Sequence, residues 1–122
     1  MKVLVVDDEP IVLTSCRMVL EAEGCEVMTA GTVQEALSFL ESQAFELLLI
    51  DVKMPVLDGM YLVRQVGKKR PRMPIIVMSG YSTDDTIREA LDLGAATFIA
   101  KPFTPDELAD AVRSVLKPRE KE

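Results

Sequence analysis

The sequence of 122 residues has no histidine and only two cysteines. The cysteines lack the paired spacing of a zinc site, and there is no histidine to complete one, so a zinc centre is disfavoured. Cys16 and Cys25 both lie in apolar surroundings. We therefore expect two reduced core thiols rather than a disulfide, and a reducing compartment.

Long apolar runs are also missing from the chain. None approaches the roughly 20 residues that cross a bilayer. The apolar start of the sequence meets Asp7 and Asp8 too soon for a signal peptide. We therefore expect a soluble, cytoplasmic protein that does not attach to membranes.

The chain has no excess of basic residues, because 14 Lys and Arg stand against 20 Asp and Glu, a formal net charge of −6. This balance disfavours direct binding to nucleic acid or anionic lipid. One basic run, at residues 68–72, departs from it. Because this run falls where a helix should end, we interpret it as a solvated helix C-terminus, with a nucleic-acid contact as the alternative.

Short apolar segments alternate with amphipathic segments along the chain. The apolar segments predict strands buried in a sheet, at residues 3–6, 25–30, 47–50, 74–78 and 96–100. Helical spacing and capping signals predict a helix after each strand, beginning near Pro10, Thr32, Met60, Ser82 or Thr83, and Thr104. The alternation predicts a single α/β domain of the flavodoxin-like type, with five parallel strands in the order 2-1-3-4-5 and helices on both faces.

Two glycines are placed to end helices in this pattern. Gly24 follows the first amphipathic segment, and Gly94 follows the fourth. In the helix before Gly94, we expect Ile87, Ala90 and Leu91 to supply the apolar positions.

Polar residues follow four of the predicted strands, and all of them should meet at one edge of the sheet. They are Asp7 and Asp8 after the first strand, Asp51 after the third, Ser79 after the fourth and Lys101 after the fifth. We expect Asp51 to be a rigidly held, partly exposed acid. Because the first and third strands are neighbours, three carboxylates converge and repel one another unless a cation intervenes. Oxygen ligands without His or Cys favour Mg²⁺, with Mn²⁺ as a second choice.

These residue types together predict a site for phosphoryl transfer. Asp51 would attack phosphorus as the nucleophile. The Ser79 hydroxyl, the Lys101 ammonium and the metal would each stabilise one equatorial oxygen of the transferred group. The product would be an aspartyl phosphate, which the same site could hydrolyse.

The motifs in which these residues occur are VVDDE at 5–9, LIDVKMP at 49–55 with DG at 58–59, MSG at 78–80, GA at 94–95 and KPF at 101–103. In combination they resemble the receiver domains of two-component response regulators, over essentially the whole chain. The stretch at 78–82 is similar to receivers that precede AAA+ transcription activators. We accordingly expect a receiver domain at residues 1–117 and a charged tail at 118–122 that begins a linker to an output domain.

The resemblance implies that Asp51 accepts a phosphoryl group from a phosphohistidine on a sensor histidine kinase or a phosphotransfer protein. It implies that Asp8, Asp51 and the backbone carbonyl of Lys53 bind Mg²⁺, with Asp7 acting through a water. The domain would catalyse only its own phosphorylation and dephosphorylation. In this family the peptide bond between Lys101 and Pro102 is often cis.

The resemblance also implies a switch. When Ser79 is drawn to the phosphoryl group, Phe98 would swing inward and remodel the face made by the fourth helix, the fifth strand and the fifth helix. Lys53 and Tyr81 lie where family members vary and where side chains overhang the path of the hydrolytic water. We expect this bulky pair to slow self-dephosphorylation. Whether phosphorylation drives homodimerisation is left open by the sequence.

Each of these residues has a simpler interpretation on its own. Asp8 or Glu9 could be a helix N-cap, Ser79 a turn former, Lys101 a solvated strand end and Phe98 a core residue. Only their joint placement at successive strand ends favours the phosphoacceptor site.

Three alternatives use a similar scaffold. A haloacid-dehalogenase-like phosphatase would have the motif Asp-x-Asp at its nucleophile. In this chain the second Asp of that motif is replaced by Lys53. A flavin binder would need a phosphate loop where this chain has the acids of residues 7–9. The remaining alternative is an interaction domain that works without phosphorylation, which the intact acid set disfavours.

Overall fold

The computed structural model describes residues 1–53, 59–80 and 82–116, without the side chain of Leu116. Its strands are β1 Lys2–Val6, β2 Glu26–Ala30, β3 Leu47–Asp51, β4 Ile75–Ser79 and β5 Thr97–Ala100. Its helices are α1 Pro10–Ala22, α2 Val33–Ser42, α3 Gly59–Lys69, α4 Asp84–Asp92 and α5 Pro105–Leu116. Every predicted element is therefore confirmed in type and in position along the chain.

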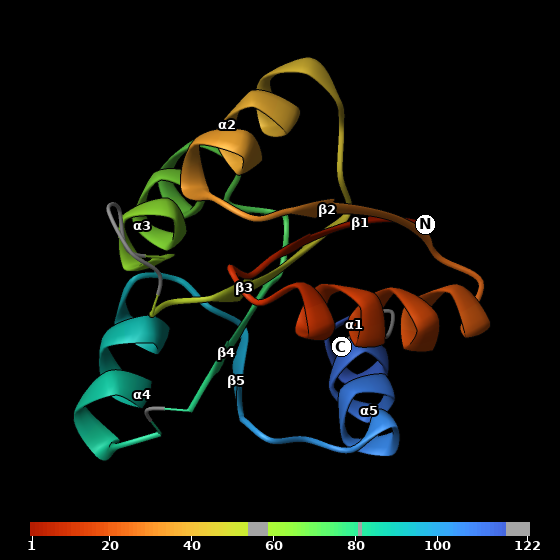
Figure 1. Ribbon diagram of the computed structural model, residues 1–122. Helices are drawn as coiled ribbons and strands as arrows, with labels where there is room; N and C mark the ends of the chain where they lie inside the picture. The colour runs from red at the N-terminus through yellow and green to blue at the C-terminus, as the bar shows by residue number, and fades with distance from the viewer. Residues whose placement is uncertain (54–58, 81, 117–122) are drawn as a thin grey trace, which may run out of the picture.

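The strands form one parallel sheet in the order β2-β1-β3-β4-β5 (Figure 1). The predicted order is confirmed, and β2 and β5 are the edge strands. The central strand β3 is buried at all five positions, whereas β5 is only partly buried. The register places Val6 beside Ile50 and Asp51 beside Met78, so the strands end close to the same level.

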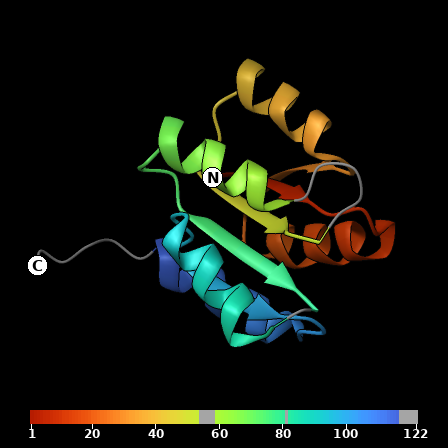
Figure 2. The ribbon, with the colours of Figure 1, turned by 90° about the vertical axis from the view of Figure 1, so that its left-hand side faces the viewer.

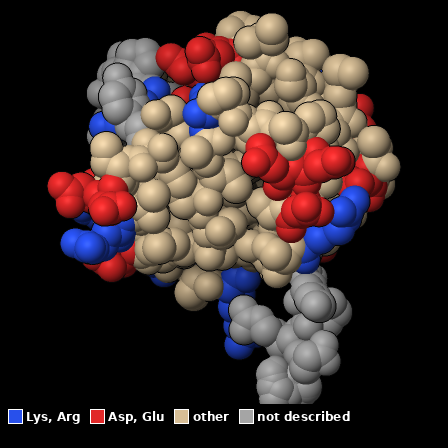
Figure 3. Space-filling model, turned by 90° about the horizontal axis from the view of Figure 1, so that it is seen from below, with Lys and Arg blue, Asp and Glu red and all other residues tan. Residues whose placement is uncertain are grey.

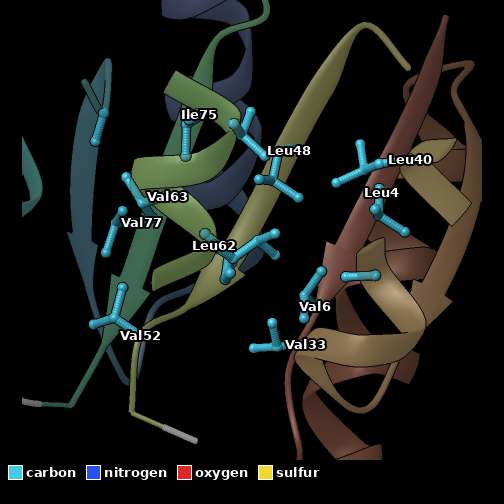
Figure 4. Packing of buried hydrophobic residues seen from close by; sticks show 14 of the residues in the cluster. Leu4, Val6, Val33, Leu40, Leu48, Val52, Leu62, Val63, Ile75 and Val77 are labelled. Carbon is cyan, nitrogen blue, oxygen red and sulfur yellow. The ribbon is translucent and has the colours of Figure 1, made fainter. Parts of the chain in front are cut away.

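Alternate residues of the central strands point to opposite faces and form two separate cores. On one face Leu4, Val6, Leu48 and Ile50 pack beneath α2, α3 and α4 (Figures 1 and 4). On the other face the strands contribute Val3, Val5, Leu47, Leu49, Ile76 and Met78, which pack beneath α1 and α5 (Figure 2). The sheet is covered by helices on both sides, as the uniformly apolar strands predict.

The helix termini follow the capping signals of the sequence. Thr32 and Thr83 each accept a hydrogen bond from the backbone N–H three residues later, so Thr83 rather than Ser82 caps α4. Gly24 and Gly94 follow α1 and α4 with φ angles of 91° and 115°, a conformation that favours glycine. The basic residues Lys68 and Lys69 occupy the last turn of α3, which confirms their interpretation as a helix C-terminus.

One expected apolar stripe is wrong in part. In α4 Ala90 is fully buried, but Leu91 is 45% exposed. A helix turns by about 100° per residue, so the neighbour of a buried position can face solvent. Leu91 is therefore a surface residue of α4.

Cys16 and Cys25 are not joined in a disulfide, as expected, with Cys16 buried and Cys25 partly buried. Within the described ranges, no helix has the length and apolar character needed to cross a membrane.

Candidate functional site: an acid cluster with a central lysine

The candidate site lies at the carboxyl ends of four strands. Asp7 directly follows β1, Asp51 and Ser79 are the last residues of β3 and β4, and Lys101 directly follows β5. Backbone hydrogen bonds fix the outer two positions, because Asp7 N–H donates to Ala30 O at 3.1 Å and Lys101 N–H donates to Ser79 O at 2.9 Å. The sheet therefore places all four residues along one edge.

The Lys101 ammonium group lies at the centre of the cluster. Its Nζ is 2.7 Å from Asp7 Oδ2 and 2.9 Å from Asp51 Oδ2. A third carboxylate oxygen, Glu9 Oε1, lies 3.1 Å away. An ammonium group has three N–H donors, so each of its donors has a carboxylate acceptor.

The second oxygen of each buried aspartate accepts a backbone hydrogen bond from the residue two positions later. Glu9 N–H donates to Asp7 Oδ1, and Lys53 N–H donates to Asp51 Oδ1, both at 2.9 Å. This local turn is typical of aspartate at the end of a strand. It fixes the orientation of both carboxylates before any ligand binds.

The prediction that Asp51 is partly exposed is wrong. The residue is only 5% exposed, and Asp7 and Ser79 are fully buried. The reason is the Lys101 side chain, which lies against both aspartates and is itself only 14% exposed. Asp7, Asp8 and Asp51 form the acid set of the site, and Asp8 is its exposed member.

Burial and pairing have opposite effects on the ionisable groups. Burial raises the pKa of the Asp7 carboxyl above its usual value, although the hydrogen bonds from Lys101 and Glu9 N–H oppose this change. Burial alone would lower the pKa of Lys101, but its hydrogen bonds to Asp7, Asp51 and Glu9 outweigh that effect and raise the pKa. Lys101 is therefore a permanent cation at neutral pH.

The acid set has the donor types for a divalent cation. Asp7, Asp8 and Asp51 each offer one carboxylate oxygen, and these oxygens lie within 4.8 Å of one another. Oxygen donors at this separation fit Mg²⁺ or Mn²⁺, which bind through one or two carboxylates and keep several waters. The residues present therefore fit the metal that the sequence predicts.

A surface cavity of about 630 Å³ opens beside the cluster. Its lining includes Asp8, Asp51, Lys53, Gly80 and Lys101. The buried phosphoacceptor candidate is therefore reachable from solvent on this side. The peptide bond between Lys101 and Pro102 on the cavity wall is cis.

The remaining predicted site residues lie in different environments. Phe98 is half-buried on β5 and packs against the core beneath α2, α3 and α4. Lys53 is exposed just beyond β3. Tyr81 lies outside the described residues, and so do residues 54–58, which include the end of the LIDVKMP motif and Asp58 of the DG motif.

Sequence reasoning did not assign Glu9 to the site. In the sequence Glu9 is the third acid of the VVDDE motif, and helix capping is its simpler interpretation. It occupies the N-cap position of α1, but its side chain does not cap the helix and instead reaches Lys101. Three acids in succession are a sequence signal that Glu9 belongs to the site. The direction of the Glu9 side chain, however, depends on Lys101, which lies 92 positions away in the sequence.

Residues 3–113 match the family model of the response regulator receiver domain. The chain belongs to this family. Receiver domains are signalling domains of two-component systems rather than enzymes acting on other substrates.

Curated relatives of this receiver domain differ widely in length. The alginate biosynthesis transcriptional regulatory protein AlgB of Pseudomonas putida is 33% identical over 98% of this chain, which spans only 27% of AlgB. The sporulation initiation phosphotransferase F of Bacillus subtilis is 33% identical over 94% of this chain and 93% of its own length. Receiver domains therefore occur among its relatives both within long regulators and as nearly the whole protein.

The fold of this receiver domain has solved counterparts. A CheY-like receiver domain protein from Methanospirillum hungatei superposes with a TM-score of 0.88 and 35% sequence identity, over 93% of this chain and 90% of the other.

Proposed function

We propose that this receiver domain is a signalling switch that accepts a phosphoryl group on Asp51. The observation that carries the proposal is the contact of one ammonium group, Lys101 Nζ, with both Asp7 and Asp51 at the strand ends. A cation fixed beside a carboxylate can bind the oxygens of a group transferred to that carboxylate. Asp7, Asp8 and Asp51, whose oxygens could hold a divalent cation, add the acidic half of such an environment.

In the proposed reaction, a carboxylate oxygen of Asp51 attacks phosphorus of a phosphohistidine. The new P–O bond forms as the P–N bond breaks, and the leaving imidazole keeps the electron pair and takes up a proton. Lys101 and the Ser79 hydroxyl would each bind one equatorial oxygen of the transferred group. Lys53 N–H already holds the second oxygen of Asp51 and thereby orients the carboxylate.

Asp8, Asp51 and the backbone carbonyl of Lys53 would hold the metal, with Asp7 acting through a water. When bound, Mg²⁺ would supply positive charge against the phosphoryl oxygens. The distance of at most 4.8 Å between the three carboxylate oxygens supports this assignment.

We further propose that the phosphorylation state is transmitted through α4, β5 and α5. Ser79 and Phe98 lie on the adjacent strands β4 and β5, where Val77 is paired with Phe98 and Ser79 with Ala100. Movement of Ser79 toward a phosphoryl group would therefore change the packing of the half-buried Phe98. Figure 3 views the side on which α4 and α5 lie, and uncharged atoms fill the area between two charged flanks. Leu91, a residue of α4, is exposed.

The proposed partners follow from this mechanism. A sensor histidine kinase or a phosphotransfer protein would supply the phosphoryl group in the cytoplasm, and an output domain would read the switched face. AlgB is much longer than the matched region, which supports a further output domain. We propose that this domain follows residues 1–117 and is joined through the tail at 118–122, as in receivers ahead of AAA+ activators. A homodimer formed on phosphorylation belongs to the same proposal and is tested by light scattering on the phosphorylated domain.

Lys53 and Tyr81 are proposed to set the lifetime of the phosphoryl group. Lys53 lines the cavity through which a hydrolytic water would reach Asp51. We expect Lys53→Asn and Tyr81→Glu to shorten the half-life of the phosphorylated domain. A half-life unchanged in both variants would contradict this role.

The test of the proposed function is intact-mass measurement after incubation with acetyl phosphate, in Mg²⁺ or in EDTA. We expect one phosphoryl adduct on the wild type, which depends on Mg²⁺ and is absent from Asp51→Asn. The absence of an adduct on a folded wild-type domain would overturn the proposal. It would favour an interaction domain that works without phosphorylation.

A further inference from the structure

Glu9 occupies a position in the site that no step of the proposed transfer uses. Its Oε1 lies 3.1 Å from Lys101 Nζ, and its carboxylate lines the 630 Å³ cavity beside Asp8 and Asp51. The side chain is 59% exposed, whereas the side chains of Asp7 and Asp51 are 0% and 6% exposed. Glu9 is therefore the acceptor of Lys101 that lies at the mouth of the cavity.

The contact has a direct consequence for ligand binding. All three N–H donors of Lys101 have carboxylate acceptors, so a phosphoryl oxygen can receive one only if an existing hydrogen bond opens. Asp51 is the group that reacts, and Asp7 is fully buried and also fixed by Glu9 N–H. Opening either of those bonds would leave a buried carboxylate without its cation. Opening the Glu9 bond exposes the Glu9 carboxylate to water, which solvates it.

The backbone of Glu9 supports such a movement. Its carbonyl accepts hydrogen bonds from Val12 N–H at 3.0 Å and Leu13 N–H at 3.2 Å, and its own N–H binds Asp7. The side chain takes no part in these bonds, because it does not cap α1. The carboxylate can therefore leave Lys101 without disturbing the start of the helix.

We propose that Glu9 is a positioning residue: it holds the third N–H of Lys101 in the unphosphorylated domain and releases that donor to the phosphoryl group. This inference rests on the proposed function. The Glu9 carboxylate also repels a free donor, and this repulsion grows with the negative charge that the donor carries. Glu9 thus limits phosphorylation by small-molecule donors.

The test compares Glu9→Gln and Glu9→Ala with the wild type by the rate of adduct formation in Mg²⁺. The donors are acetyl phosphate, with a net charge near −2, and phosphoramidate, with a net charge near −1. Exposed ion pairs contribute up to about 1 kcal/mol, which corresponds to about fivefold. We therefore expect both variants to react about two- to fivefold faster with acetyl phosphate, and to gain less with phosphoramidate. Glu9→Asp, which keeps the charge, should restore most of the wild-type preference between the donors.

Glu41→Gln is the matched control, because it removes the same charge from an exposed position on α2 that does not line this cavity. Its rates should equal those of the wild type. A second measurement is the ¹⁵Nζ resonance of Lys101 in the unphosphorylated domain, which should shift in Glu9→Ala and not in Glu41→Gln.

The two proposals fail in different ways. If the wild type forms no adduct with either donor, the proposed function is overturned and this inference with it. If the wild type is phosphorylated but the Glu9 variants keep the rates and the donor preference of Glu41→Gln, only the role of Glu9 is overturned.

Discussion

Gly59 at the start of α3 lies directly against the backbone of Asp51. A Cβ at this position would overlap the Asp51 carbonyl oxygen and lie 2.6 Å from Val52 Cα. The Gly59 N–H also donates to Val52 O at 3.0 Å. The absence of a side chain at residue 59 thus allows α3 to pack against the end of β3.

Gly59→Ala should therefore destabilise the fold and displace Asp51. Both neighbours are backbone and cannot rotate away, so we expect a loss of about 3 kcal/mol in the free energy of unfolding, at the upper end for overpacking. Urea unfolding followed by circular dichroism measures this loss. Gly31→Ala is the control, because its Cβ would meet only ordinary contacts at 3.7 and 4.0 Å. Equal stability of the two variants would contradict the close approach.

Thr104 forms a capping box at the start of α5. Its Oγ1 accepts from Glu107 N–H at 3.1 Å, and Glu107 Oε1 accepts from Thr104 N–H at 2.8 Å. We expect Thr104→Ala to lower the free energy of unfolding by about 1 kcal/mol, because an N–H of the first turn loses its acceptor. Thr104→Ser keeps the hydroxyl and should stay close to the wild type in the same urea titration. A loss of equal size in both variants would assign the effect to the methyl group instead.

Much of this architecture could be predicted from local pattern alone. Leu47 to Ile50 are too uniformly apolar for a strand with one wet face, and that run ends at Asp51. Parallel strands bring their carboxyl ends to one edge, so the meeting of Asp51 with Lys101 follows from topology. The helix caps at Thr32 and Thr104 could be predicted from local sequence, because each hydroxyl binds the backbone N–H of a residue only three positions later.

What the sequence could not provide is the direction of long side chains toward distant partners. The turn of Glu9 toward Lys101 and the bidentate pairing of Arg113 with Glu23 join residues 92 and 90 positions apart. No local periodicity encodes such contacts. The burial of Asp51 was missed for a related reason, because the Lys101 side chain that covers it comes from another strand end.

The two cysteines should differ in reactivity. Burial, and then the nearby Asp7 carboxylate, raise the pKa of the Cys16 thiol to about 12. Each unit of pKa lowers the thiolate fraction about tenfold at a pH below both values, so at pH 8 we expect Cys16 to react about a thousandfold more slowly than an unperturbed thiol. Its complete burial slows it further. Cys25 is only partly buried, and burial raises its pKa as well.

A thiol-disulfide reagent at pH 8 separates the two residues through the single-cysteine variants Cys16→Ser and Cys25→Ser. Cys16→Ser retains Cys25 and should be labelled under native conditions, whereas Cys25→Ser should be labelled only after addition of urea. Rapid native labelling of Cys25→Ser would contradict the burial of Cys16.

Lys101→Gln removes the cation that Asp7 and Asp51 share in a buried site. Two buried carboxylates without a counter-ion should lower the free energy of unfolding by about 3 to 5 kcal/mol at pH 7. Burial already raises the pKa of Asp7, and loss of the ammonium raises it further. When the pKa of a carboxyl is higher in the folded state than in the unfolded state, its contribution to the free energy of unfolding is fully present at pH values below the unfolded-state pKa. This contribution is lost as the pH rises through the folded-state pKa. The deficit of Lys101→Gln should therefore be largest at neutral pH and shrink toward about pH 4.

Urea unfolding at several pH values between 4 and 8 measures this dependence. The control is the double variant Asp7→Asn with Lys101→Gln, in which the buried carboxylate at residue 7 is also neutral. It should regain part of the lost stability at pH 7 and depend less on pH, because the group whose protonation is linked to folding is gone. A deficit of the same size at every pH, in both the single and the double variant, would mean that Lys101 stabilises the fold through packing rather than through its charge.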